Sequence, residues 1–253
     1  MEAPSATVEV DELGYRVDGH CILEGITFRV GAGEILGIMG MSGSGKTTIL
    51  KNVIGLLRPT RGDVRIEGVS LNGLPERELA PIRRKMGMCF QYSALFDSLT
   101  VGENVAFPLR QHTRLKDAEV RRIVSAKLET VGMKGTEGAM PAELSGGERK
   151  RVGIARALAL DPSIMLYDEP SAGLDPIMAG VVDRLIEDLG HHLSVTSIVV
   201  SHHVQNVLRI SDRVVMIHEG RIVTEGDPEH IRASDNEIVR QFVTGSATGP
   251  IQV

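Results

Sequence analysis

The chain opens with apolar and polar positions that alternate, which predicts strands before any helix. Residues Thr7–Val17 alternate partly and Ile22–Val30 alternate more regularly, with glycines placed between and after them to form turns. A period of two is typical of strands that are buried on one face only. We therefore expect an antiparallel β-structure at the beginning of the chain.

Farther along, short apolar runs and helical patterns take turns. The expected strands are Glu34–Met39, Asp63–Glu67, Met86–Gln91, Ile164–Tyr167, Val195–Ser201, Arg213–Ile217 and Arg221–Glu225. The expected helices are Lys46–Leu57 (stopped by Pro59), Pro75–Lys85 (which Pro81 is placed to split), Lys116–Val131, Glu148–Leu160, Pro176–Leu189 and Val204–Ile210. This alternation predicts a largely parallel sheet covered by helices. The segment Gly245–Val253, rich in Gly, Ser, Thr and Pro, is expected to lack regular structure.

Composition narrows the class of protein. With 253 residues and 42% hydrophobic side chains the chain can bury a large core. Its net charge of −5 provides no overall basic field, so we expect no nucleic-acid partner. Two cysteines, Cys21 and Cys89, do not form a disulfide framework and favour the cytosol, with Cys89 expected in the core. The N-terminal stretch Met1–Ala6 does not resemble a signal peptide, and no run of about 18 apolar residues predicts a membrane span.

The first apolar strand leads into a glycine-rich loop, Gly40–Thr48, that reads GMSGSGKTT and fits G-x-x-x-x-G-K-[ST]. Glycines allow backbone N–H groups to turn onto a phosphate, and the dipole of the following helix favours the same anion. Lys46 is predicted to reach the β- and γ-phosphates, and the Thr47 hydroxyl to bind Mg²⁺. We therefore expect the loop to bind ATP or a related nucleotide. The predicted binding residues are Ser42, Gly43, Ser44, Gly45, Lys46, Thr47 and Thr48.

A second motif ends the apolar run Ile164–Tyr167 with two acids and a proline. An acid at the carboxyl end of a parallel strand lies beside the phosphate loop, so Asp168 is suited to hold Mg²⁺ through water. Glu169, one residue beyond the strand, is predicted to polarise the water that attacks the γ-phosphate.

A third motif, Leu144–Glu148, reads LSGGE and stands before a helical pattern. The Ser145 side chain and the N–H groups of Gly146 and Gly147 would form a second anion site at the head of that helix. The phosphate loop already grips the β-phosphate, so within one chain this second site is spare.

The LSGG sequence resembles the signature of ABC ATPases, and other motifs follow that family's order. By this resemblance Gln91 is the Q-loop glutamine, a catalytic and Mg²⁺-binding residue, and His202 is the catalytic switch histidine. Asp175 ends a D-loop and Tyr15 resembles the aromatic residue that stacks on adenine. Glu148 stands where many relatives have Gln or Met, at the edge of the γ-phosphate site.

One residue departs from the family pattern. An acid commonly follows the switch histidine, whereas this chain has His203. The departure puts the local charge in doubt, not the catalytic assignment. Metal binding by the histidine pairs at 191–192 and 202–203 is the weaker interpretation, because adjacent side chains point in different directions.

The resemblance implies an α/β fold with one ABC ATPase domain over residues 1–253. It would contain a RecA-like P-loop NTPase core with a mostly parallel sheet, an antiparallel β subdomain, an α-helical subdomain at about 93–160 and a C-terminal tail at about 235–253. In this family two ATP molecules lie between two head-to-tail ABC units. Since the chain has one unit, the partner would be a second copy of it.

The finer resemblance concerns what is transported. The segment Phe90–Arg110 and the tail motif Val239–Gly245, followed by Gly249-Pro250, are similar to ATPases of lipid transporters that contain mammalian-cell-entry (MCE) domain proteins. This implies phospholipid transport with an integral membrane permease and an MCE-domain partner, at the cytoplasmic face of the inner membrane. Four apolar residues are expected to contact the permease in part: Leu95, Phe96, Val105 and Phe107.

Other members of the family remain as alternatives. An importer of amino acids or metals has a similar Q-loop region, and an iron–sulfur assembly ATPase has a similar length. A chromosome-associated ATPase would need long heptads in the middle of the chain, and a translation-factor ATPase would need two ABC units. Neither feature occurs in this sequence.

Overall fold

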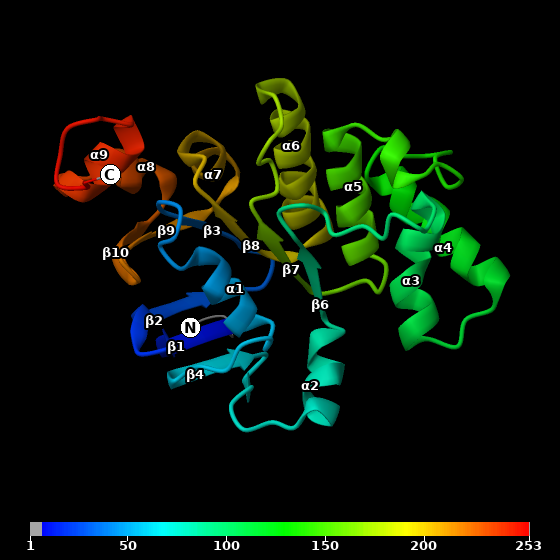
Figure 1. The fold of residues 1–253 in the computed structure, drawn as a ribbon, viewed down its shortest axis with the longest axis horizontal. Coiled ribbons are helices and arrows are strands. Elements are labelled where there is room, and N and C mark those ends of the chain that lie inside the picture. The colour runs from blue at the N-terminus through cyan, green and yellow to red at the C-terminus, as the bar shows by residue number, and fades with distance from the viewer. Residues whose placement is uncertain (1–6, 253) are drawn as a thin grey trace.

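Two β-sheets lie close together in the structure, a computed structural model that describes residues 7–252 (Figure 1). The first is built from β1 (Val8–Val17), β2 (His20–Val30), β4 (Arg61–Ile66) and β5 (Val69–Ser70), in the order β2-β1-β4-β5. All three pairings are antiparallel, which confirms the expectation from the alternating pattern. The stretch Met1–Ala6, expected not to be a signal peptide, lies outside the described residues, as does Val253.

The second sheet is mostly parallel. It contains β3 (Ile35–Met39), β6 (Met86–Cys89), β7 (Ile164–Asp168), β8 (Thr196–Ser201), β9 (Arg213–His218) and β10 (Arg221–Gly226), in the order β10-β9-β3-β8-β7-β6. Only β10 pairs antiparallel to its neighbour. Every residue of β3, β7 and β8 is buried, as their uninterrupted apolar runs predict. Because the parallel strands end at one edge, the residues that follow β3, β6, β7 and β8 meet there.

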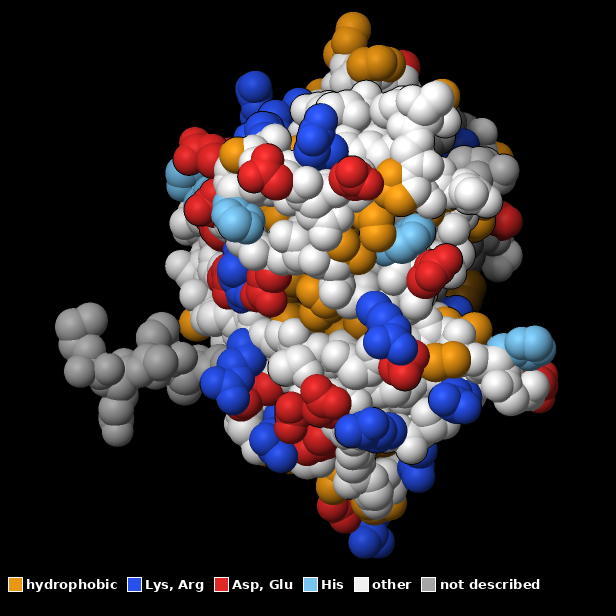
Figure 2. Space-filling view, turned by 90° about the vertical axis from the view of Figure 1, so that its left-hand side faces the viewer, with side chains coloured by type: hydrophobic (Ala, Val, Ile, Leu, Met, Phe, Trp, Pro, Cys, Tyr) orange, Lys and Arg blue, Asp and Glu red, His pale blue; other side chains and the backbone are white. Residues whose placement is uncertain are grey.

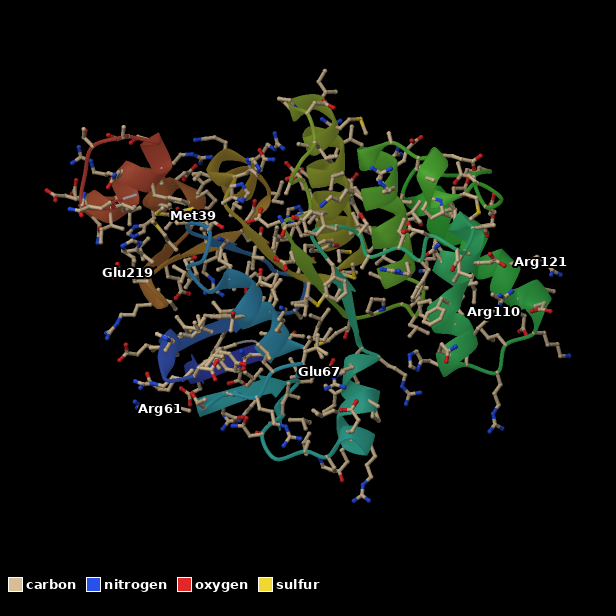
Figure 3. The ribbon with its side chains drawn as sticks, in the orientation of Figure 1. Met39, Arg61, Glu67, Arg110, Arg121 and Glu219 are labelled. Carbon is tan, nitrogen blue, oxygen red and sulfur yellow. The ribbon has the colours of Figure 1, made fainter. Side chains whose placement is uncertain are left out.

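Helices pack around these sheets and extend the molecule at both ends (Figure 1). They are α1 (Lys46–Val53), α2 (Glu76–Arg83), α3 (Val101–His112), α4 (Asp117–Thr130), α5 (Gly146–Ala157), α6 (Pro176–Leu193), α7 (Val204–Ile210), α8 (Pro228–Arg232) and α9 (Glu237–Thr244), with a 3₁₀ turn at Pro141–Glu143. Helices α3 and α4 occupy one end, where Arg110 and Arg121 project (Figure 3), and α8 and α9 the other. No helix within residues 7–252 combines the length and apolar character that a membrane span requires.

The surface at the end that carries α8 and α9 has a mixed distribution of charged side chains. Figure 2 faces this end, and its Lys and Arg side chains are interspersed with Asp and Glu instead of forming one field. The structure therefore presents no single-sign surface on this face.

Several element boundaries differ from the sequence-based expectations. Helix α1 ends at Val53 instead of Leu57, because Gly55 takes a left-handed conformation (φ 71°) and the N–H groups of Leu56 and Leu57 bond back to the Lys51 carbonyl. Pro81 lies inside α2 without splitting it. Helices α8 and α9 were not predicted from the sequence. They begin at the side-chain caps Asp227 and Asn236.

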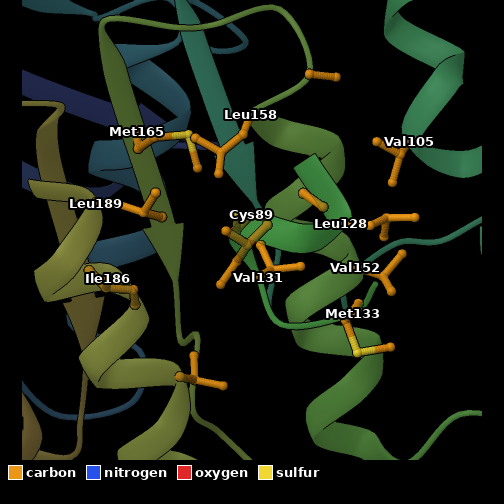
Figure 4. Packing of buried hydrophobic residues seen from close by; sticks show 14 of the residues in the cluster. Cys89, Val105, Leu128, Val131, Met133, Val152, Leu158, Met165, Ile186 and Leu189 are labelled. Carbon is orange, nitrogen blue, oxygen red and sulfur yellow. The ribbon is translucent and has the colours of Figure 1, made fainter. Parts of the chain in front are cut away.

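The largest hydrophobic cluster joins the parallel sheet to the helices at residues 101–157. Figure 4 shows it between β7, α5 and α6, with Met165, Val152 and Leu189 among its members and the buried Cys89 beside them, as expected. Helix α5 therefore stands between the sheet and α3 and α4, and shares one core with both.

One expectation for the segment after the Q-loop was wrong. Val105 is fully buried in this core, so it does not face a partner. The reason is helical spacing, since Val101, Val105 and Leu109 recur every four residues on the inner face of α3. Leu95 is partly buried and packs against the same core, and its contact with a permease stays a prediction. Phe96 and Phe107 are partly exposed, and their ring centroids lie 4.8 Å apart.

Candidate active site

The phosphate loop connects the buried strand β3 to the first turn of α1. Gly45 caps this helix in a left-handed conformation (φ 103°). A Cβ atom at this position would lie 2.5 Å from Leu23 Cδ2 and 3.2 Å from the Ile22 carbonyl oxygen. Any other residue would therefore be strained and would collide with β2. Position 45 requires glycine because the loop packs tightly against β2.

Lys46 is buried, with 6% of its surface exposed. Its Nζ donates to the carbonyl oxygens of Gly40, at 2.7 Å, and Met41, at 2.8 Å. Burial lowers the pKa of Lys46, and the nearby carboxylates of Glu169 and Asp168 oppose this shift. Among residues 7–252 the buried Ser44 hydroxyl has no hydrogen-bond partner. A positive side chain beside an unsatisfied polar atom fits the anionic phosphate of a nucleotide.

Thr47 and Asp168 form the part of the site suited to a cation. Burial raises the pKa of the Asp168 carboxyl, while the hydrogen bond from Thr47 lowers it and the Glu169 charge raises it further. Within residues 7–252 no cluster of three or more His, Cys, Asp or Glu side chains could hold a metal. One hydroxyl and one carboxylate fit Mg²⁺, which uses few protein oxygens and completes its coordination with water and phosphate.

Glu169 is the first residue after β7 and has a left-handed backbone (φ 47°). Its Oε1 accepts from the His202 backbone N–H at 3.0 Å and lies 2.7 Å from His202 Nδ1. Its Oε2 accepts from the Ser201 hydroxyl at 2.9 Å. A carboxylate can only accept, so Nδ1 carries the proton of this contact and leaves Nε2 for another partner. Three donors from the end of β8 thus fix the orientation of the carboxylate.

Two residues in this region were missed from the sequence. Ser201 ends an apolar strand without any distinguishing signal. Lys150 lies among other basic residues of α5, yet its Nζ donates to the carbonyl oxygens of Gln91 and, at 3.1 Å, Glu169. The half-buried Gln91, which follows β6, is thereby held next to the end of β7.

The signature residues stand at the N-terminus of α5. Ser145 caps this helix: its hydroxyl donates to Glu148 Oε2 at 2.7 Å, and its backbone N–H donates to the same oxygen at 2.8 Å. These two contacts lower the pKa of Glu148. Gly147 packs against α6, where an added Cβ would lie 2.4 Å from Met178 Cε, while Gly146 is more open. The signature serine is therefore satisfied within its own helix.

Three other predicted residues lie apart from the phosphate loop. Tyr15 is half-buried on β1 and packs against the core between the sheets. Asp175 caps α6 by accepting from the N–H groups of Ile177 and Met178 at 3.0 and 3.1 Å. Among the hydrogen bonds of residues 7–252, none joins Tyr15, Asp175 or Ser145 to the loop Gly40–Thr48. The structure thus brings one group of the predicted site residues together at the phosphate loop. It leaves Tyr15, Asp175 and Ser145 apart from that group.

A phosphate loop at the head of α1, with an Asp–Glu pair at the end of the parallel strand β7, defines a P-loop NTPase site. A profile of the ABC transporter family matches residues 23–172 of the chain. The chain belongs to this family. It binds ATP and is the ATP-hydrolysing subunit of an ABC transporter, with the fold of an ABC ATPase domain.

Relatives support the assignment over nearly the whole of this chain. The intermembrane phospholipid transport system ATP-binding protein MlaF of Haemophilus influenzae is 43% identical over 97% of this chain and 93% of the relative. The protein of the same name from Escherichia coli is 40% identical over 96% of this chain and 91% of its own length. A Mycobacterium leprae protein named probable ribonucleotide transport ATP-binding protein mkl is 42% identical over 96% of this chain and 70% of its own.

Solved structures agree in fold. The ATP-binding cassette MJ0796, described as a dimer bound to ADP and Pi after hydrolysis, superposes with a TM-score of 0.80 at 32% identity, covering 87% of this chain and 98% of its own. CbiO1 from Clostridium perfringens, part of the cbiONQ transporter complex, superposes with a TM-score of 0.84 at 30% identity, covering 94% of each chain.

Proposed function

We propose that this chain powers phospholipid transport across or between membranes. The observation that carries this proposal is the similarity, over nearly full length, to two proteins named as ATP-binding subunits of intermembrane phospholipid transport systems. The segment Phe90–Arg110 and the tail motif Val239–Gly245 add the finer resemblance to transporters with MCE-domain proteins.

Within one chain, the residues at the edge of the parallel sheet would bind and orient ATP. Lys46 would exchange its loop carbonyls for phosphate oxygens, while Thr47, Asp168 and Gln91 would hold Mg²⁺. When bound, this ion neutralises charge that develops on the phosphates. Tyr15 would stack on adenine.

Glu169 is the proposed general base. Its carboxylate is already fixed by His202 and Ser201, so it needs little reorganisation to accept a proton from a water placed in line with the γ-phosphate. The free Nε2 of His202 would contact the γ-phosphate. Phosphoryl transfer depends on positioning and charge, which these rigid contacts supply.

A complete site would require a second copy of the chain. Ser145, Gly146, Gly147 and Glu148 form an anion-binding helix start that lies apart from the phosphate loop of their own chain, and the exposed Asp175 stands at the head of α6. In a head-to-tail pair, each signature would complete the partner's nucleotide site. The cassette MJ0796, described as a dimer, supports the pairing of two ABC units.

The permease is proposed to dock on a groove of about 650 Å³ beside the Q-loop. Exposed aromatic side chains border it, including Phe90, Phe96 and Phe107. Aromatic side chains are enriched at protein–protein interfaces, so their exposure here favours an interaction site. The chain would thus be peripheral, at the cytoplasmic face of the inner membrane, with the permease linking it to an MCE-domain protein. We propose one ABC ATPase domain over residues 1–253, with its helical subdomain at about 93–160 and its tail at about 235–253.

Purification of the intact complex from membranes tests the function. We expect a polytopic membrane protein and an MCE-domain protein to copurify, and mass spectrometry to find a bound glycerophospholipid. Because one relative is named for ribonucleotide transport, a bound nucleotide outside the ATP sites would favour that second candidate. A soluble scaffold as the only partner would contradict transport.

A further inference from the structure

Lys150 is a buried cation outside the set of residues assigned to nucleotide binding. It lies on α5, five residues after the signature serine, with 9% of its surface exposed. Its ammonium donates to two main-chain oxygens: that of Gln91, and that of Glu169 at 3.1 Å. These oxygens belong to segments 78 residues apart in the sequence, so Lys150 joins three motifs at one point.

Both carbonyls belong to backbone that is not held by regular structure. Glu169 has φ 47°, which turns the chain sharply out of β7. After Gln91 the chain turns through two left-handed residues, Ser93 at φ 60° and Ala94 at φ 47°. Such conformations persist only when the surroundings fix them. Lys150 supplies a fixing contact to each segment.

A second cation of α5 holds the same turn farther along. Arg156 donates to the carbonyl oxygens of Ser93, at 2.8 Å, and Ala94, at 2.6 Å. Helix α5 therefore holds the Q-loop at two places. Of these two cations only Lys150 also reaches the end of β7, so it connects α5 and the Q-loop to the carboxylate side of the site.

Burying the Lys150 ammonium costs free energy because the charge loses its contact with water. Burial lowers the pKa of Lys150, and the charges of Glu169 and Asp168 oppose that shift, yet within residues 7–252 no carboxylate forms an ion pair with it. A buried charge satisfied by carbonyl oxygens alone contributes little net stability. This indicates a role in geometry.

We propose that Lys150 is a positioning residue for ATP hydrolysis. Its ammonium fixes the main chain of Gln91 and Glu169 against the signature helix, so that the Q-loop and the catalytic carboxylate keep one geometry relative to α5. This inference rests on the proposed role of Glu169 as general base. It does not depend on which substrate is transported, because the readout is hydrolysis.

The test compares three variants of the purified complex. Lys150→Met removes the donors and keeps an unbranched side chain that is one atom shorter. We expect kcat to fall about tenfold or more, since small misplacements of catalytic groups have large effects on rate. KM and ATP affinity should stay within about twofold, because Lys150 acts on positioning and not on ground-state binding. Lys150→Arg, which keeps a cation, should retain more of kcat than Lys150→Met.

Arg151→Met is the matched control. Arg151 is the next residue of α5 and donates to the carbonyl oxygens of Val131, at 3.2 Å, and Gly132, at 3.0 Å, away from the site. An unchanged kcat in Lys150→Met, or an equal fall in Arg151→Met, would overturn the proposal.

A double variant separates this proposal from the base assignment. If Lys150 acts through Glu169, Lys150→Met should change the residual single-turnover rate of Glu169→Gln by less than about twofold. If the rate reductions of the two single variants multiply fully in the double variant, Lys150 does not act through Glu169, and the inference is overturned. A normal rate in Glu169→Gln alone would instead refute the base assignment.

Discussion

Thr47 and Asp168, 121 positions apart in the sequence, are joined by a hydrogen bond of 2.9 Å between Oγ1 and Oδ1. Thr47 belongs to the first turn of α1 and Asp168 is the last residue of β7. The bond closes the place where we propose Mg²⁺ to bind, between a hydroxyl and a carboxylate that are both held by rigid elements.

The burial of Asp168 should reduce stability at neutral pH. Because burial raises its pKa in the folded protein, the folded state keeps the proton to a higher pH than the unfolded chain does. Stability is therefore lost as the pH rises through this raised pKa. We expect Asp168→Asn to melt at a higher temperature than the parent at neutral pH without nucleotide, and to lose this advantage in acid.

Asp175→Asn serves as the control for this measurement. Asp175 is exposed and caps α6, a role that Asn fills equally well, so the melting temperature should not change. A lower melting temperature for Asp168→Asn at neutral pH would contradict the expected cost of the buried carboxylate.

Lys46→Ala should weaken ATP binding by about 10- to 100-fold, since a hydrogen bond to a charged group contributes about 1.5–3 kcal/mol. Isothermal titration calorimetry measures this directly. Lys51→Ala, an exposed lysine of the same helix, should bind normally. Equal affinities for the parent and Lys46→Ala would refute the assignment of the phosphate loop.

Glu169→Gln should lower kcat by about 100-fold or more while ATP still binds, because the amide cannot accept a proton. The ATP-bound dimer should accumulate and be visible by size-exclusion chromatography. Glu219→Gln is a matched control, since Glu219 is also left-handed (φ 47°) but lies in the exposed turn between β9 and β10 (Figure 3) and is none of the residues predicted to bind ATP. Its phosphate release should equal that of the parent.

Mixed dimers test whether Ser145 serves the partner. When Ser145→Ala and Glu169→Gln are on one subunit, the other subunit's intact catalytic residues face a defective signature, and hydrolysis should be lost. When the two substitutions are on different subunits, one complete site remains and about half of the activity should persist. Ser145→Ala also removes a helix cap, at about 1 kcal/mol, in both arrangements. Equal activities would therefore rule out a shared site.

Local patterns predicted much of this structure. The strands around the phosphate loop and the acids after β7 are encoded in short continuous segments, and the fold and the ATPase family were confirmed. The contacts of Lys150 and Ser201 could not be predicted, because they join residues that only the folded sheet brings together. Val105 was misplaced because an apolar helix residue on its own does not reveal which face is covered. The roles of individual site residues remain predictions.

The Lys46 ammonium is already satisfied by two carbonyl oxygens of its own loop. A ligand must form stronger contacts with Lys46 than these two carbonyl oxygens do. Binding replaces existing hydrogen bonds of the ammonium instead of creating new ones. Orthophosphate brings one tetrahedral anion, whereas a nucleoside triphosphate adds further phosphates and a base that find partners elsewhere. These two hydrogen bonds thus raise the affinity that a ligand needs in order to bind, and so disfavour occupation of the loop by free phosphate.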